Sequence, residues 1–303
     1  MKSVDLHFHL LAGVDDGPTE MEESVALAAA ALEDGTRTVV ATPHVRPEYL
    51  TDVRELHDRV TELRARLAAE RLPLAVRCGG ELGHEMVGRL RQDELDSIAQ
   101  GPPDARWLLL ETPFELPGPD FHDAAAELRE RGFGVVLAHP ERSADASLDE
   151  GAALLRELGA GAHAQLNAMS LTGGHGEDAR RAALLYARTG LASVVASDAH
   201  GPTRPPALQR AWREMLAQRV PAKLASALTG SNPRRLLSRG IRRGVPRYEA
   251  TSSGVFRRFP VPSASGSSRA GLGSSTGGGT MVASAAGSGK SASAPSVRSG
   301  SKR

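Results

Sequence analysis

The sequence predicts an α/β fold in which parallel strands alternate with helices and close into a barrel. Two observations lead to this prediction. Seven short apolar segments recur along the chain, each followed by a helical segment or a polar loop, at residues 4–10, 38–41, 74–76, 107–110, 134–138, 162–167 and 192–196. Most of these segments also end in a histidine or a carboxylate. Continuous apolar strands between helices indicate a parallel sheet covered on its outer face, and six to eight such units close most readily as a barrel.

Helices are expected between these strands. The first begins at Thr19-Glu20-Met21-Glu22, which reads as a capping box, and ends at Gly35, a typical residue just past a helix. Periodic apolar positions predict further helices over residues 51–70, 120–131, 148–158 and 177–189. Three more, near 206–218, 221–229 and 233–238, would complete the domain.

The composition divides the chain into a folded body over residues 1–250 and a tail over residues 251–303. The tail is rich in Ser, Gly and Ala, carries seven Lys or Arg and no Asp or Glu, and is predicted to be disordered. The body then holds 30 basic and 36 acidic residues, a net charge of −6. Such a body argues against general nucleic-acid binding. The tail is expected to be a passive linker, or alternatively an electrostatic tether to an acidic partner or anionic lipid.

The compartment is predicted to be the cytoplasm. The one cysteine, Cys78, permits no intramolecular disulfide and suits a reducing environment. The sequence begins without a long apolar segment, and no uncharged apolar run reaches the roughly 20 residues of a membrane helix. A cysteine-dependent phosphatase is also disfavoured, because the position where its arginine would stand relative to Cys78 is occupied by His84. Cys78 is therefore expected to be a small packing residue.

The polar residues at the strand ends form a set of metal-ligand types. Apolar and polar residues alternate strictly over residues 4–10, so His7 and His9 share one face of the first strand, about 6.5 Å apart. Each residue taken singly could instead belong to a polar strand face, to a turn at Asp15-Asp16-Gly17, or to an ion pair between a glutamate and an arginine. The repetition favours ligands, and the set consists of His7, His9, Asp16, His44, Glu81, Glu111, His139, Asp198 and His200.

Nine ligands exceed the needs of one ion, so two or three are expected, with Glu81 as a bridge. Imidazole and carboxylate donors without thiolate suit Mn, Fe or Zn better than Mg or Ca alone.

The order of these residues resembles the PHP (polymerase and histidinol phosphatase) superfamily, and most of all its bacterial manganese-dependent protein tyrosine phosphatases of capsule and exopolysaccharide regulation. The resemblance covers about residues 1–238 and implies a distorted (β/α)7 TIM-like barrel with a trinuclear site. All nine residues match ligand positions of the family, Arg142 matches its catalytic arginine, and Arg204 matches a second arginine on the substrate side. The motifs that carry the resemblance are His7-Phe8-His9, Gly13-Val14-Asp15-Asp16-Gly17, Ala41-Thr42-Pro43-His44, Gly79-Gly80-Glu81, His139-Pro140-Glu141-Arg142, Ser197-Asp198-Ala199-His200 and Asn232-Pro233.

The implied activity is hydrolysis of phosphotyrosine by water that divalent ions activate. Three ions would supply a charge of about +6 against about −4 from four carboxylates, and this surplus would attract a phosphate dianion. A tyrosine leaving group has a pKa of about 10 and departs readily, so a dedicated acid is less necessary, although Asp5 or His163 could serve as one. The resemblance further implies a phosphotyrosine protein as partner, in particular a bacterial tyrosine autokinase.

Other functions remain open at this point. The same site could act on histidinol phosphate or another small phosphoester, or serve a 3′–5′ exonuclease, which the acidic body disfavours. A barrel that only binds ligands is a third interpretation, which the complete ligand set disfavours. His57, His122 and His175 lack a strand-end position and are expected to be ordinary surface residues, whereas Tyr186 and Trp212 are expected to pack between helices.

Overall fold

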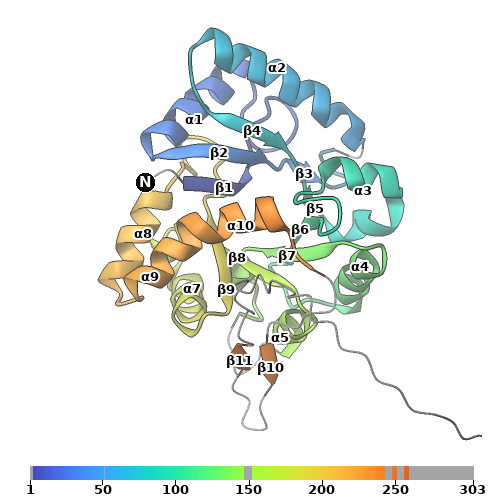
Figure 1. The fold of residues 1–303 in the computed structure, drawn as a ribbon, viewed down its shortest axis with the longest axis vertical. Coiled ribbons are helices and arrows are strands. Elements are labelled where there is room, and N and C mark those ends of the chain that lie inside the picture. Colours follow the sequence, from blue (N-terminus) through green and yellow to red (C-terminus); the bar gives the residue numbers. More distant parts are fainter. Residues whose placement is uncertain (1–2, 51, 147–151, 243–247, 251–255, 259–303) are drawn as a thin grey trace, which may run out of the picture. The chain divides into compact units, whose positions relative to one another are not determined.

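Parallel strands and covering helices make up most of the computed structural model, which describes residues 3–50, 52–146, 152–242, 248–250 and 256–258. The described residues belong to one compact unit within residues 1–260. The α/β fold with parallel sheets that the sequence predicts is confirmed (Figure 1). Most of the segment 251–303 lies outside the described residues, so its disorder stays a prediction.

The strands form two parallel sheets. In the first, the order is β1 (Ser3–Phe8), β2 (Thr36–Ala41) and β4 (Ala75–Cys78). In the second, the order is β3 (His44–Val45), β5 (Glu81–Leu82), β6 (Trp107–Glu111), β7 (Gly134–Ala138), β8 (His163–Asn167) and β9 (Ala192–Ala196). A short antiparallel pair, β10 (Tyr248–Ala250) with β11 (Phe256–Arg258), was not predicted, and β11 lies beyond the predicted boundary at residue 250.

Hydrogen bonds connect the two sheets. Along the chain, β2 and β3 are separated only by Thr42 and Pro43. The hydrogen bonding continues across this break, because the Glu81 N–H donates to the Pro43 carbonyl at 3.0 Å. At the other edge, the Asp198 N–H donates to the His7 carbonyl at 3.0 Å and the His9 N–H to the Ala199 carbonyl at 2.9 Å. The order therefore returns from β9 to β1, as a distorted barrel requires.

Helices cover the outer faces of the strands, with α1 and α2 beside β2 and β4 in Figure 1. The predicted helices are present, although residue 51 of one and residues 148–151 of another lie outside the described residues. The helices α3 and α6 and the two-residue strands β3 and β5 were not predicted. The helices are α1 (Met21–Glu33), α2 (Leu56–Ala69), α3 (Gln92–Ile98), α4 (Pro119–Glu130), α5 (Ala152–Gly159), α6 (Ala168–Leu171), α7 (Glu177–Thr189), α8 (Leu208–Ala217), α9 (Ala222–Ser226) and α10 (Asn232–Arg239). Short 3₁₀ segments cover residues 53–55, 84–89 and 140–142, and a π-helical turn covers residues 227–231.

The start of α1 differs in detail from the predicted capping box. The Thr19 N–H and hydroxyl both donate to the Glu23 carboxylate, at 2.7 and 2.9 Å, so the partner is Glu23 and not the predicted Glu22. The helix begins at Met21, two residues after Thr19, which places Glu23 within reach. Gly35 follows the helix with φ +86°, the left-handed conformation that glycine adopts easily.

Two apolar cores lie on opposite sides of the strands. The outer core fills the layer between strands and helices. The inner core includes Val40, Leu109, Val136 and Val194 and also takes side chains from the end of the domain, such as Leu236 of α10. The Trp107 indole donates to the Leu236 carbonyl at 3.0 Å, which fixes α10 against the strands.

The first strand departs from the strict alternation that its sequence predicts. Val4 and Leu6 belong to the inner core, but Phe8 and Leu10 belong to the outer one. A register shift between Asp5 and Phe8 separates the two pairs. Such irregularities re-aim side chains.

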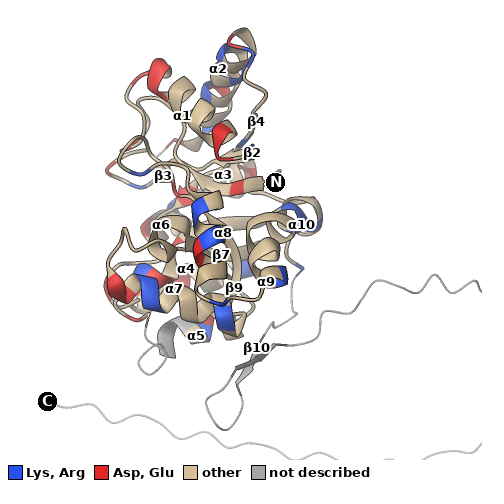
Figure 2. Ribbon diagram, turned by 90° about the vertical axis from the view of Figure 1, so that its left-hand side faces the viewer, with Lys and Arg blue, Asp and Glu red and all other residues tan. Residues whose placement is uncertain are grey.

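Charged residues are distributed over the helices in both signs (Figure 2). On α7, for example, Arg180 lies 3.4 Å from Glu177, and Arg181 pairs with Asp178. Exposed pairs of this kind contribute about 0–1 kcal/mol each. None of the helices in the described part of the chain combines the length and the hydropathy that a membrane span requires.

Replacing Gly79 by alanine is expected to destabilise the fold by about 1–3 kcal/mol, because overpacking displaces neighbours. A Cβ on Gly79 would lie 2.5 Å from Val40 Cγ1 and 3.3 Å from the Ala41 carbonyl oxygen. Urea unfolding measures the loss. Gly159→Ala is the control, because a Cβ there meets nothing within 4 Å, and equal stability of the two variants would contradict the packing argument.

Candidate metal centre

The residues predicted as ligands converge at the carboxyl ends of the strands. His7 lies on β1 and His9 follows it, His44 and Glu81 begin β3 and β5, and Glu111 ends β6. The register pairs His44 with Glu81 directly. The remaining residues lie in the segments that follow strands: Asp16, His139, Asp198 and His200.

Eight of the nine residues form three overlapping groups whose donor atoms lie within 4.8 Å of one another. The first group consists of His7, His9, Glu81 and Asp198, the second of His9, Asp16, His44 and His200, and the third of His44, Glu81 and Glu111. His9 belongs to the first and second groups, His44 to the second and third, and Glu81 to the first and third. The groups therefore describe three adjacent positions.

His139 lies outside these three groups but next to them. Its Nε2 lies 2.9 Å from Glu81 Oε1, and its ring stacks on that of His7 with centroids 5.5 Å apart. The structure thus brings all nine predicted residues into one cluster, with Glu81 in contact with histidines through both of its oxygens.

The donor atoms are spaced as ligands of common ions would be. The Nε2 atoms of His7 and His9 lie 3.0 Å apart. Glu81 Oε2 lies 3.1 Å from the first, 3.3 Å from the second and 3.0 Å from His44 Nδ1. Two donors about 2.1 Å from one ion and at right angles to each other would be about 3.0 Å apart.

Several buried side-chain atoms of the clustered residues have no hydrogen-bond partner of suitable geometry among the described residues. They include Glu81 Oε2, His44 Nδ1, His139 Nδ1 and His200 Nε2. Burying a polar atom without a partner costs about 1–3 kcal/mol, and more for a charged group. Divalent cations would satisfy such atoms, so the donor set and its orphaned atoms fit a metal centre.

The field around His7 and Glu81 favours positive charge. Burial disfavours the imidazolium of His7, but Glu81 and Asp198 outweigh burial and raise the pKa of His7 to about 9. Despite complete burial, His7 and His44 hold the pKa of Glu81 well below its usual range. The Glu81 carboxylate is therefore ionised at neutral pH, which suits cation binding.

Two of these residues have a backbone conformation that is rare outside glycine. His139 has φ +35° and Asp198 has φ +53°. Both lie just after an apolar strand, so the turn into the left-handed region directs the side chain into the cluster. Such strain costs about 1–3 kcal/mol and clusters at functional sites.

Polar neighbours orient the cluster. Asp15 Oδ2 lies 2.6 Å from His9 Nδ1 and also accepts the His44 N–H at 2.9 Å. Gln165 Oε1 lies 2.9 Å from His7 Nδ1, and the Asn167 amide donates to Asp198 Oδ2 at 2.7 Å. Such partners fix the ring orientation of ligands.

No site role was predicted from the sequence for Asp15, Gln165 or Asn167. Asp15 lies in a segment that is typical of a turn. Gln165 and Asn167 do carry a signal, as polar residues that alternate with Ala164 and Leu166 in a strand between helices.

Arg142 and Arg204, the two arginines predicted from the sequence, line a pocket of about 360 Å³ at the cluster. The lining also includes Asp16, His44, Glu111, His139 and Asp198. Arg142 Nη1 lies 3.5 Å from Asp198 Oδ2, and its guanidinium lies 4.5 Å from the centre of the Phe114 ring. Arg204 donates to Asp16 Oδ2 at 2.5 Å.

A third arginine in this pocket, Arg46, was missed from the sequence. Its Nη1 donates to Glu111 Oε2 at 2.7 Å, and its Nε lies 2.9 Å from Glu85 Oε1. An ion pair with arginine, the alternative that the sequence left open for the glutamates, therefore exists for Glu111. The contacts of Glu81 are with histidines instead.

Two histidines expected at the surface are not there. His122 is buried, and its Nδ1 lies 2.7 Å from Glu157 Oε1, while Arg129 donates to the other oxygen of Glu157 at 2.7 Å. His175 is partly buried beside Ser170, and burial together with Arg142 lowers its pKa to about 4. His57 is exposed, as expected.

The cysteine and the two suggested acids lie away from the pocket lining. Burial raises the pKa of the Cys78 thiol to about 11, so the thiol stays protonated at neutral pH. Asp5 is fully buried, accepts the Ser197 N–H at 3.0 Å, and has its pKa raised by burial to about 6. Neither Asp5 nor His163 is among the described residues that line the pocket.

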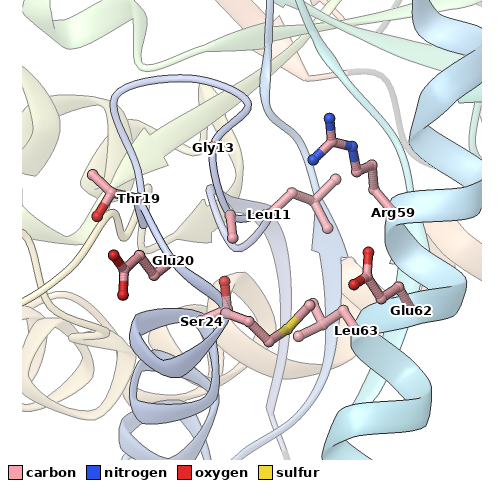
Figure 3. A pocket seen from close by; sticks show the side chains of 10 residues that line it. Leu11, Gly13, Thr19, Glu20, Ser24, Arg59, Glu62 and Leu63 are labelled. Atoms are coloured by element: carbon pink, nitrogen blue, oxygen red, sulfur yellow. The ribbon is translucent and has the colours of Figure 1, made fainter.

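A second pocket, of about 240 Å³, lies between the loop after β1 and helices α1 and α2 (Figure 3). Leu11 and Gly13 come from the loop, Ser24 from α1, and Arg59 and Glu62 from α2. None of the described residues that line it is a predicted ligand, whereas five of the predicted ligands line the first pocket.

Comparison with known proteins agrees with this arrangement. The chain is 32% identical to the tyrosine-protein phosphatase YwqE of Bacillus subtilis over 199 residues, 65% of this chain and 77% of YwqE. It is 30% identical to the tyrosine-protein phosphatase CpsB of Streptococcus pneumoniae over 246 residues, 77% of this chain and 98% of CpsB.

Solved structures agree as well. One from a crystallographic study of these two proteins, described as unique metal-dependent tyrosine phosphatases, superposes with a TM-score of 0.69 at 30% identity, covering 80% of this chain and 98% of that one. A phosphotriesterase homology protein from Escherichia coli shares the fold, with a TM-score of 0.53 at 14% identity, over 77% of this chain and 97% of its own. The family described as capsular polysaccharide synthesis, CpsB/CapC, matches residues 3–238, and the chain belongs to this family.

Proposed function

We propose that this protein is a metal-dependent protein tyrosine phosphatase. One observation carries the proposal: each of three overlapping groups of imidazole and carboxylate donors contributes at least one residue to the lining of a pocket that Arg142 and Arg204 also line. The relatives at about 30% identity are tyrosine-protein phosphatases, which supports the same reaction.

The nine clustered residues are proposed to hold two or three divalent ions, with manganese as the resident metal and iron or zinc as alternatives. When bound, such ions activate water and neutralise charge that develops on a phosphoryl group. Glu81 is suited to bridge, because its two oxygens contact different histidines. Asp15, Gln165 and Asn167 would keep His7, His9 and Asp198 in place.

Arg142 is proposed to be the catalytic arginine. A guanidinium binds phosphate through two parallel N–H bonds, which gives it both charge and orientation. The long 3.5 Å contact with Asp198 leaves donors of Arg142 available, and the guanidinium carbon lies over the Phe114 ring. Arg204 is proposed to bind the substrate beside the second group of donors, where it is anchored on Asp16.

The substrate is proposed to be a phosphotyrosine protein of capsule synthesis, in particular a bacterial tyrosine autokinase, and the reaction is proposed to occur in the cytoplasm. A phenolate leaves with a pKa of about 10, so the reaction needs little help from a proton donor. The family description, capsular polysaccharide synthesis, supports this assignment.

Removal of metal is expected to abolish turnover of a phosphotyrosine peptide, and added manganese is expected to restore it, because the ligands alone cannot activate water. The measurement is phosphate release after chelation, dialysis and readdition of Mn, Fe or Zn. Unchanged turnover by fully metal-depleted protein would exclude the proposed chemistry.

Glu81→Gln is expected to remove at least about one ion per chain, because a neutral amide is a much weaker ligand than a bridging carboxylate. Elemental analysis of protein purified with manganese measures this, with circular dichroism as a check on folding. Glu130→Gln, on the exposed end of α4, is the control. Full metal content in the Glu81 variant would rule out the bridge.

Arg142→Ala is expected to lower kcat/KM by about 100- to 1,000-fold while metal content is kept, the usual effect of losing one stabilising donor group. The kcat/KM of Arg142→Lys should lie between those of the unaltered protein and Arg142→Ala, because lysine keeps the positive charge but not the planar pair of N–H donors. Arg204→Ala should have a smaller effect of about tenfold. Arg213→Ala, on the outer side of α8 away from the pocket, is the control, and retained turnover in Arg142→Ala would remove this residue from the reaction.

Side-by-side turnover of a phosphotyrosine peptide, histidinol phosphate and a small alkyl phosphate distinguishes the proposed substrate from the other phosphoesters. The peptide is expected to have the highest kcat/KM, because only its leaving group is a phenolate. Exclusive turnover of the alkyl esters would contradict the proposal.

A further inference from the structure

Two aromatic side chains stand half-exposed at the pocket that holds the ligand cluster. Tyr49 is 46% exposed and Phe114 is 47% exposed, and both line this pocket together with the arginines. Among the described residues, they are two of only four large hydrophobic side chains with this degree of exposure. Exposed apolar surface that borders a polar site is typical of a binding surface.

Each ring is held in place by a different histidine of the cluster. Tyr49 stacks on His44 with centroids 5.2 Å apart and an interplanar angle of 18°, and Phe114 stacks on His139 at 5.8 Å and 28°. These two histidines contact different oxygens of Glu81, at 3.0 and 2.9 Å. The two rings therefore stack on different histidines of the cluster and line the same pocket.

The position of Phe114 also links the aromatic wall to the phosphate-binding group. The Arg142 guanidinium lies over its ring at 4.5 Å. A substrate whose phosphate contacts Arg142 would thus bring the first group beyond its ester oxygen next to Phe114. In a phosphotyrosine that group is an aromatic ring, and aromatic rings prefer neighbours with centroids about 4.5–7 Å away.

We infer that Tyr49 and Phe114 form an aromatic clamp that receives the ring of an aryl phosphate and so determines the preference for phosphotyrosine. This inference rests on the proposed phosphatase function. The clamp would hold the ring while the phosphoryl group reaches the donors at the base of the pocket. An alkyl phosphate of serine or threonine has no ring to fill the same space.

The test compares a substrate that has a ring with a ligand that lacks one. For Tyr49→Ala and Phe114→Ala, kcat/KM on a phosphotyrosine peptide is expected to fall about 3- to 10-fold each, and about 10- to 100-fold in the double variant, mainly through KM. The inhibition constant of inorganic phosphate and the manganese content are expected to stay within about twofold, since neither involves the ring.

Conservative variants and a neighbouring position serve as controls. Tyr49→Phe and Phe114→Tyr keep a ring and should restore most of the kcat/KM that the corresponding alanine variants lose. Leu116→Ala should also be unchanged, because Leu116 lies in the same loop as Phe114 and is 65% exposed but does not line the pocket.

Two results would overturn the clamp. Unchanged kcat/KM in the double variant is one. A parallel loss of inorganic phosphate binding is the other, because it would mean that the rings merely position Arg142 and His44. Failure of the unaltered, manganese-loaded protein to hydrolyse the peptide would instead contradict the phosphatase function itself, so the two proposals fail in different ways.

Discussion

The burial of carboxylates and imidazoles at one point is the constraint on which the rest of this structure depends. Glu81 and Asp198 are almost completely buried, and each lies within 3.3 Å of both His7 and His9. Polar groups at this density are costly in a protein interior unless a positive charge accompanies them. The fold therefore makes sense as a scaffold that concentrates negative potential where a cation, and then a phosphate, is to be bound.

The apolar core of the barrel and the predicted metal ligands occupy different parts of the fold. The inner core and α10 fill the interior with apolar side chains, including Leu236 and Ile241. The carboxyl ends carry the donors, as in other parallel barrels, where the active site lies on this face. The break at Gly79 and Gly80 permits β4 and β5 to lie close to Val40 and Val45, which places Glu81 beside His44.

The sequence predicted the parallel α/β fold and the gathering of the nine polar residues, because both depend on a local pattern: an apolar run followed by a donor. What it missed depends on contacts between distant segments. Arg46 pairs with Glu111 across 65 residues, and Gln165 reaches His7 across 158. The interrupted alternation of β1 was missed for a similar reason, since a register shift is defined by the partner strand. Tyr49 and Phe114 lie in loops, where apolar residues carry no periodic signal.

The left-handed backbone at His139 and Asp198 has a thermodynamic consequence. The strain at these two positions opposes folding, and cations held by the clustered donors would bind the folded chain in preference to the unfolded one. By linkage, ligation that favours the native chain raises its melting temperature with metal concentration. The cell's supply of divalent ions would then govern how much of this protein persists as well as how fast it works.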